Sequence, residues 1–580
     1  MKKLLPFLKP YCVQCVVGPL FKLFEAVLEL LLPTVMAFVI NEGINKEDQA
    51  FVYRMGGVML VMTVLGFGSS MVCQYLASRA SQGFGTGLRN AMFRKILSLS
   101  QSQVDQITTS SLVTRLTNDI NQLQVAVAML IRLVVRAPFI CIGAVAMAMM
   151  LDLKLSLILL LATPLIALIL YLVIHKTAPL YRQYQGKLDQ MTTLLREFFS
   201  GSRVIRAFAK NEQESQRFRQ SNEDITATAL RVAKFSALLN PLTTGVMNIA
   251  VLFILWMGAQ RIEEGGLLQG EIIAYVNYVT QIVVALIVIS NLVVLFTKAF
   301  ACAGRVSEVL SMESALSDSA KEIPPFLSEA PAVEFDHVSF RYNQNADQLF
   351  ENVSFQVKKG ETVGIIGGTG SGKSSLVQLL LRFYDVDSGS IKIDGVDVRR
   401  YPLAALRAKI GLVPQKTLLF SGTVAENLRW GNSNASMEQL VSAAQAAQAH
   451  EFVTQMKDGY QSPVSRGGKS LSGGQRQRLT IARALVRRPE ILILDDSSSA
   501  LDYRTDAVLR RELARHHAET TSIIVAQRIS SIKGADHILI LDGGEMIGYG
   551  THAQLMKTCP VYQEIAESQM GTAGEVSEDA

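Results

Sequence analysis

The chain has 580 residues, of which 49% are hydrophobic and 18% charged, and its formal net charge is +6. The charged share lies below the roughly 25% of an ordinary soluble domain. Disordered proteins are poor in hydrophobic residues, so the composition excludes a disordered chain. Six cysteines scattered over this length exclude a small disulfide scaffold, and the length predicts several domains because one core rarely exceeds about 300 residues.

Six apolar stretches occupy the N-terminal half, and each is long enough to cross the ~30 Å hydrocarbon core of a bilayer as a helix. They lie near residues 12–40, 52–78, 125–151, 154–175, 238–260 and 272–297. The polar segments between them at 79–124 and 176–237 keep apolar residues at helical spacing, so we expect them to continue the membrane helices into water. Residues 1–310 are therefore predicted to form a six-helix transmembrane domain with long cytoplasmic extensions.

Basic residues are concentrated before the first stretch and in both long loops, whereas the alternate connections are short and poor in Lys and Arg. Because basic loops are retained in the cytoplasm, we expect the N-terminus, the long loops and the C-terminal half to be cytoplasmic. The short loops and the lack of transit features favour a bacterial inner membrane.

Four charged residues fall in or near the apolar stretches as two pairs at i, i+4 spacing. Glu25 and Glu29 lie in the first stretch, and Arg132 and Arg136 lie in the third. Each pair occupies one helix face. Charges in membrane helices face a cavity or a partner, so the pairs are either a polar strip on a substrate pathway or ion pairs between helices.

The C-terminal half alternates strands and helices. Residues 311–331, rich in Ser, Glu and Pro, are predicted to be a linker, and residues 332–567 an α/β domain. The runs at 333–340 and 350–357 alternate like half-buried antiparallel strands, while those at 362–367 and 491–496 are continuous apolar runs typical of buried parallel strands. The small, acidic tail at 568–580 is expected to be disordered.

A phosphate-binding loop follows the strand at 362–367, because the sequence matches G-x-x-x-x-G-K-[ST] and precedes a helix-like run. Glycines let backbone N–H groups surround phosphate oxygens, Lys373 adds a positive charge, and the Ser374 hydroxyl suits Mg²⁺. The expected nucleotide-binding residues are Gly367, Gly368, Thr369, Gly370, Ser371, Gly372, Lys373, Ser374 and Ser375.

Two further motifs fit the same chemistry. The strand at 491–494 ends in Asp495, where a carboxylate beside a phosphate loop is the expected Mg²⁺ partner. A second anion site is expected at a helix start, where Ser472 and Gln475 have capping-box spacing. Its residues are Leu471, Ser472, Gly473, Gly474 and Gln475.

Together these motifs resemble an ATP-binding cassette (ABC) half-transporter of the exporter type, over nearly the whole chain. The resemblance implies two such subunits, with each MgATP held between one phosphate loop and the other subunit's LSGGQ. It also implies that Tyr342 stacks on adenine, that Gln415 contacts Mg²⁺ together with Ser374 and Asp495, and that Asp502 contacts the partner. A coupling helix near 209–212 would dock on the partner. The expected substrate is an amphipathic small molecule, drug-like or lipid-like, that is exported from the cytoplasm or the inner leaflet. The other expected partner is the lipid bilayer, and no nucleic acid is involved.

The sequence departs from the family pattern at two catalytic positions. The family's glutamate after the Mg²⁺ aspartate is Asp496 here, and its switch histidine is Gln527. The shorter side chain sets the carboxylate back by about 1.5 Å, and Gln carries neither positive charge nor a movable proton. The site is therefore predicted to bind MgATP but to hydrolyse it poorly.

The economical interpretation is a heterodimer in which this chain's LSGGQ completes the partner's hydrolytic site. Arg466, where exporters commonly have an acid, supports asymmetry. Three alternatives stay open: an active homodimeric exporter, a siderophore-type importer with an exporter fold, and an ATP-gated channel or regulator.

Overall fold

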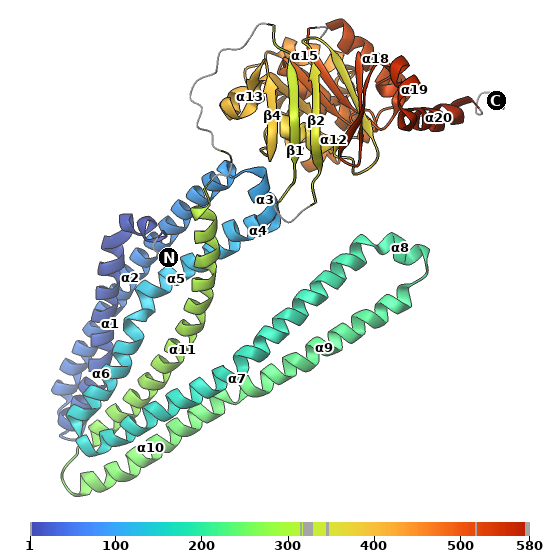
Figure 1. Cartoon of the computed structure of the whole chain (residues 1–580). Helices are drawn as coiled ribbons and strands as arrows, with labels where there is room; N and C mark the ends of the chain where they lie inside the picture. The colour runs from blue at the N-terminus through green and yellow to red at the C-terminus, as the bar shows by residue number, and fades with distance from the viewer. Residues whose placement is uncertain (1–2, 314–315, 317–328, 344–346, 517–518, 575–580) are drawn as a thin grey trace. The chain divides into compact units, whose positions relative to one another are not determined.

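The computed structural model describes residues 3–313, 316, 329–343, 347–516 and 519–574 (Figure 1). It divides into a helical unit, Met1–Leu97 with Thr109–Met312, and an α/β unit, Ser98–Thr108 with Glu313–Ala580. Most of the predicted linker lies outside the described residues. The last helix of the helical unit, α11, ends at Ser311, and the first strand, β1, begins at Val333.

The helical unit confirms the expected membrane helices. Among the described residues, six helical segments are long and apolar enough to cross a membrane: Lys9–Ile44, Gln49–Ser98, Thr109–Leu151, Leu153–Ser200, Asn211–Glu263 and Gln269–Ser311. Their α-helices are α1 (Cys12–Phe38), α2 (Gln49–Ser98), α4 (Thr109–Thr114), α5 (Ile120–Met129), α6 (Arg136–Leu151), α7 (Leu153–Ser200), α9 (Asn211–Ala237), α10 (Leu239–Glu263) and α11 (Gln269–Ser311).

The polar segments between the apolar stretches are helical, as predicted. α7 and α9 run side by side as a long hairpin closed by the short helix α8 (Ser202–Ala207) (Figure 1). The range 209–212, near which the coupling helix is expected, follows α8 and includes the first residues of α9. Ala209 has a left-handed backbone (φ +51°) in the turn between the two helices.

Pairing between helices accounts for one of the membrane charges in each predicted pair. Arg136 on α6 donates to Glu29 on α1, with Nη2 and Oε2 2.6 Å apart. Glu25 instead accepts from Lys22 one turn away, and Arg132 donates to the Ser78 hydroxyl on α2 at 2.7 Å. The ion-pair alternative thus holds for Glu29 and Arg136, whereas Lys22 is a partner that the sequence analysis did not identify.

The α/β unit contains two main sheets. A four-stranded sheet has the order β2-β1-β4-β5 and a six-stranded sheet the order β12-β11-β3-β10-β9-β6. The strands are β1 (Val333–Phe340), β2 (Phe350–Val357), β3 (Thr362–Gly367), β4 (Ser388–Ile393), β5 (Val396–Asp397), β6 (Ile410–Val413), β9 (Ile491–Asp495), β10 (Thr521–Val525), β11 (His537–Asp542) and β12 (Glu545–Gly550), with β7 (Gly422–Thr423) and β8 (Pro463–Val464) as a separate pair.

The antiparallel β1–β2 pair and the buried parallel strands β3 and β9 match the sequence patterns. Because β3, β10, β9 and β6 are parallel neighbours, the loops that follow them meet at one edge of the sheet. The helices of the unit are α12 (Lys373–Leu380), α13 (Leu403–Lys409), α14 (Val424–Arg429), α15 (Met437–Ala446), α16 (His450–Thr454), α17 (Gly473–Val486), α18 (Tyr503–His516), α19 (His552–Thr558) and α20 (Pro560–Gly574).

The tail expected to be disordered, 568–580, lies only in part within the described residues. Residues 568–574 continue helix α20, and residues 575–580 lie outside the described residues. The Gln569 side-chain amide joins α20 to the segment that follows β10. It donates to the Gln527 carbonyl at 2.9 Å and accepts from the Ile529 N–H at 2.8 Å.

A short helix from the loop between the second and third membrane helices belongs to the α/β unit. This helix, α3 (Gln101–Ile107), starts with a capping box between Ser100 and Gln103. The Tyr384 hydroxyl donates to the Asp105 carboxylate at 2.5 Å. Burial, followed by the neighbouring carboxylate, raises the pKa of Tyr384, so the hydroxyl stays protonated and remains a donor.

Replacing Tyr384 with Phe tests this contact. The variant keeps the ring but loses one hydrogen bond, which contributes about 1 kcal/mol, so amide exchange in α3 should become roughly fivefold faster. Hydrogen-exchange mass spectrometry of residues 100–108 measures the change. Tyr401→Phe is the matched control, since its buried hydroxyl bonds the Ile393 carbonyl instead. Unchanged exchange in Tyr384→Phe would show that the bond does not hold α3.

Candidate functional site

The loop between β3 and α12 has the strand–loop–helix context that the sequence predicts. Gly370 and Gly372 have left-handed backbones, with φ of +87° and +96°. A Cβ at Gly372 would also lie 2.6 Å from the Phe350 ring, so glycine is required there for two reasons. The loop leads directly into the N-terminus of α12, and the free N–H groups of a helix start favour an anion.

Lys373 begins α12 and reaches back across the loop. Its ammonium group donates to the carbonyls of Gly367 at 2.9 Å and Gly368 at 2.7 Å. Burial lowers the pKa of Lys373, while the carboxylates of Asp496 and Asp495 oppose that shift. Loop, cation and both acids therefore belong to one site, as the spacing of the motifs predicts.

Ser374 and Asp495 are brought together at the end of β9. The Ser374 hydroxyl donates to the Asp495 carboxylate at 3.3 Å. Burial raises the pKa of Asp495, with a further increase from Asp496, against the hydrogen bond from Ser374 and the charge of Lys373. A hydroxyl and a carboxylate are oxygen donors that suit Mg²⁺. The described residues contain no group of three or more His, Cys, Asp or Glu side chains that could hold a metal, so Mg²⁺ here would also need phosphate oxygens.

Two amide side chains converge on the carboxylate of Asp496. The Gln527 amide donates to Asp496 Oδ2 at 2.9 Å, and the Gln415 amide donates to the same oxygen at 3.4 Å. Asp496 is 8% exposed and has a left-handed backbone (φ +47°). Because Val525 pairs with Asp495 in the β10–β9 ladder, the residues that follow these two strands emerge side by side.

The structure joins Gln415 to Asp496 rather than to Ser374 or Asp495. Gln569, which the sequence analysis did not identify, bonds the backbone on both sides of Arg528 and so fixes the loop that carries Gln527. No pattern in the sequence distinguishes this amide from an ordinary surface glutamine.

Tyr342 lies beside the start of α12. Its hydroxyl is 2.6 Å from the Ser375 hydroxyl, and its ring meets those of Phe340 and Tyr384 edge to face with centroids 5.1 Å apart. With 41% of its surface exposed, the ring keeps an accessible face close to the phosphate loop. This position is compatible with stacking on a base.

The segment 471–475 starts helix α17 with the predicted capping box. Ser472 Oγ accepts from the Gln475 N–H at 3.2 Å, and Gln475 Oε1 accepts from the Ser472 N–H at 2.9 Å. Among the described residues, no hydrogen bond joins this segment to the phosphate loop. Asp502 accepts from the N–H and hydroxyl of Thr505, and the Thr505 N–H is the first cause of its lowered pKa.

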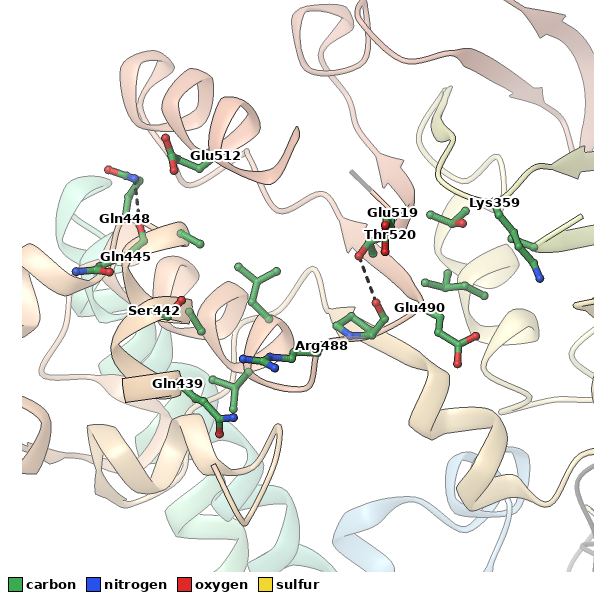
Figure 2. A pocket seen from close by; sticks show the side chains of 18 of the residues that line it. Lys359, Gln439, Ser442, Gln445, Gln448, Arg488, Glu490, Glu512, Glu519 and Thr520 are labelled. Atoms are coloured by element: carbon green, nitrogen blue, oxygen red, sulfur yellow. Dashed lines mark hydrogen bonds between the residues drawn. The ribbon is translucent and has the colours of Figure 1, made fainter. Parts of the chain in front are cut away.

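A polar hollow of about 930 Å³ lies elsewhere in the α/β unit (Figure 2). It is bordered by Glu490 and Thr520, which immediately precede β9 and β10, so it lies at the opposite edge of the sheet from Asp495. None of the expected nucleotide-binding residues lines it. The geometry therefore places the candidate site at the phosphate loop, not in this hollow.

Comparison with known families gives two matches in chain order. Residues 15–286 match the family described as "ABC transporter transmembrane region", and residues 350–499 match the family described as "ABC transporter". An uncharacterized ABC transporter ATP-binding protein, YfiB of Bacillus subtilis, is 40% identical over 580 residues, which is 100% of both chains.

Other relatives carry more specific names. A putative multidrug export ATP-binding/permease protein, YgaD of Bacillus subtilis, is 30% identical over 96% of this chain and 97% of its own. A fatty acid ABC transporter ATP-binding/permease protein of Mycobacterium bovis is 33% identical over 83% of this chain and 76% of its own. A bacterial Atm1-family ABC exporter solved with ATP bound has a similar fold, with a TM-score of 0.79, 23% identity and coverage of 97% and 98% of the two chains.

Replacing Lys373 with Ala should weaken ATP binding about 10- to 100-fold, because charged hydrogen bonds contribute about 1.5–3 kcal/mol. Equilibrium titration of the purified chain with a fluorescent ATP analogue measures the loss. Lys359→Ala is the matched control, since Lys359 lines the opposite hollow. Equal ATP affinity in the two variants would show that the nucleotide does not bind at the phosphate loop.

Acidification should weaken MgATP binding. An ordinary aspartate has a pKa of about 3.9. Because the pKa of Asp495 is raised, this side chain takes up a proton at a higher pH, and the protonated acid is a poor Mg²⁺ ligand. Affinity should therefore fall as the pH drops through the raised pKa. Calorimetric titrations over a pH series measure the fall, and in Asp495→Asn the affinity should depend less on pH. If the affinity of Asp495→Asn falls as steeply with pH as that of the unaltered chain, Asp495 is not the source of the pH dependence.

Proposed function

The chain belongs to the ABC transporter family and has the exporter architecture, and from that premise we propose that it is the poorly hydrolysing subunit of a heterodimeric exporter. As a member of this family, the chain is a multi-pass membrane protein with ATP-driven translocase activity. Our proposal assigns nucleotide binding to this chain's own phosphate loop. It assigns most of the hydrolysis to a composite site completed by a second half-transporter.

The observation that carries the proposal is the Gln527–Asp496 hydrogen bond of 2.9 Å. A general base must reach the attacking water and accept its proton. The Asp496 carboxylate is one methylene closer to the backbone than a glutamate's would be, and two amide donors already bond one of its oxygens. Gln527 can donate to this carboxylate, but it can neither carry positive charge nor pass on a proton.

The binding part of the site keeps its chemistry. Lys373, Ser374 and Asp495 retain the charge and oxygen donors that MgATP needs. In the proposed site Tyr342 stacks on adenine, and Gln415 turns from Asp496 toward the Mg²⁺ when the nucleotide is bound. The site therefore holds MgATP for long periods while turning it over slowly.

The intact segment 471–475 serves the other site. Its capping box fixes the first turn of α17, and Gly473 has no neighbouring heavy atom within 4 Å of where a Cβ would lie. A helix start with an open glycine suits phosphate. In the proposed heterodimer this surface closes on the partner's phosphate loop, and Asp502 lies close to that contact while capping α18.

We propose an amphipathic small molecule, drug-like or lipid-like, as the transported substrate. The names of two relatives, a putative multidrug exporter and a fatty acid transporter, support this class. The proposed location is the bacterial inner membrane with both termini in the cytoplasm, which agrees with the concentration of basic residues in the long loops.

Restoring the two family residues should restore hydrolysis at this site. We propose to assemble the chain with its partner after replacing the partner's catalytic glutamate with Gln, so that only this chain's site can turn over. In that background Asp496→Glu with Gln527→His should raise phosphate release about 100-fold, since a displacement of ~1 Å can cost on the order of 10²-fold.

A third substitution, Lys373→Ala, is the control for that experiment and should remove the gain because it removes binding at the same site. If the doubly restored chain releases phosphate no faster than the unaltered one, the identities of residues 496 and 527 do not limit hydrolysis.

A further inference from the structure

Five charged side chains in the first and third membrane segments carry an excess of positive charge. We call them the arginine cluster: Lys22, Glu25 and Glu29 on α1, Arg132 in the π-helical turn Leu130–Val134, and Arg136 on α6. Three cations against two carboxylates leave a formal charge of +1. Charges in membrane segments face a cavity or a partner, so the excess indicates an anion that the cluster itself does not contain.

The excess charge belongs to Arg132. Each of the two carboxylates in the cluster is already paired with one of the other cations. Arg132 instead donates to two neutral groups of α2, the Ser78 hydroxyl at 2.7 Å and the Gln74 carbonyl at 3.4 Å. Its positive charge therefore has hydrogen-bond partners in this chain, but these partners are uncharged.

The cluster also leaves polar atoms without partners. Among the described residues, Nε of Arg132, Nε of Arg136 and Oε1 of Gln281 on α11 are shielded from solvent and form no hydrogen bond. The Gln281 amide donates to the Glu29 carbonyl at 3.3 Å, so its free oxygen lies close to the Glu29–Arg136 pair. A buried polar atom without a partner costs free energy. Two of the three atoms are donors one helical turn apart, so the group that would satisfy them is an acceptor.

Arg132 lies toward the inner end of its membrane segment. It is 19 residues before Leu151, where the segment ends, and at 1.5 Å per residue this is about 29 Å, close to the ~30 Å hydrocarbon core. With both termini in the cytoplasm, as proposed, Arg132 is at the headgroup level of the inner leaflet and Arg136 lies one turn deeper. An amphiphile in this leaflet would bring its headgroup to Arg132 while its chain stays in the apolar region.

We propose that the arginine cluster binds the anionic headgroup, a carboxylate or a phosphate, of the transported amphiphile. The anion balances the excess charge and supplies acceptors to Arg132 and Arg136. This inference rests on the proposed amphipathic substrate and specifies its charge. Arg132 is the residue that determines specificity, because it carries the charge that no carboxylate of the cluster neutralises.

Competition between amphiphiles of equal chain length measures this preference. The full-length chain is reconstituted in phosphatidylcholine nanodiscs, and a fluorescent derivative of dodecanoic acid serves as the probe. Dodecyl phosphate, dodecanol and dodecyltrimethylammonium are the competitors, and empty nanodiscs correct for partition into lipid. Dodecyl phosphate should displace the probe at a concentration at least about tenfold lower than dodecanol, and the cation should be the weakest competitor.

Three variants test whether the preference depends on Arg132. Arg132→Gln should remove most of it, while Arg132→Lys should keep part of it because the positive charge remains. Arg54→Gln is the matched control, since Arg54 is an exposed arginine near the start of α2 and should not affect the preference. Equal displacement by all three competitors, or an unchanged preference in Arg132→Gln, would overturn the proposal.

An anionic phospholipid of the bilayer has the same headgroup chemistry as the proposed substrate. A second series therefore adds phosphatidylglycerol to the nanodiscs. The negative lipid surface repels the probe from the unaltered chain and from Arg132→Gln alike, so the two are compared with each other. Their difference in probe affinity should persist. Its disappearance would show that a bilayer lipid occupies the cluster and would overturn the substrate assignment.

None of these readouts depends on ATP turnover. Brisk hydrolysis by the chain alone would overturn the proposed poorly hydrolysing subunit and leave the cluster to be judged by the competition series. Failure of the competition series would in turn leave the proposed division of hydrolysis between two subunits unaffected.

Discussion

The carboxylate of Asp496 is the point on which the account depends. The β9–β10 register places the residues after the two strands side by side, and the Gln527 and Gln415 amides both donate to that carboxylate. The parallel sheet thus brings together Asp496, Gln527 and Gln415, which follow β9, β10 and β6. The same sheet places Lys373, Ser374 and Asp495 around the phosphate loop. The residues proposed for binding and those proposed for hydrolysis meet at one edge, and at that edge Asp496 and Gln527 are the two that depart from the family pattern.

The nucleotide site supports the proposed dissimilar partner for a physical reason. The reason is reach and proton transfer, since Asp496 and Gln527 are poorly suited to activate water. Arg466, where the family commonly has an acid, lies five residues before the segment 471–475, which in the proposed heterodimer completes the partner's site.

The sequence predicts local features well because they depend on neighbouring residues. The six membrane helices, the strand and helix around the phosphate loop, and the capping box at Ser472 follow from periodicity and spacing. Contacts between distant residues do not leave such a signal. The Tyr384–Asp105 bond, the Gln569 bonds near Gln527 and the choice of Lys22 for Glu25 depend on tertiary packing.

The central claim is that this polypeptide holds MgATP yet lacks the side chains to split it quickly. Its most direct test is phosphate release by the chain purified without any other subunit, with bound nucleotide measured in the same sample. The account predicts stoichiometric MgATP that remains intact over many minutes, with little steady release. Rapid, magnesium-dependent turnover, abolished by Asp496→Asn, would contradict it.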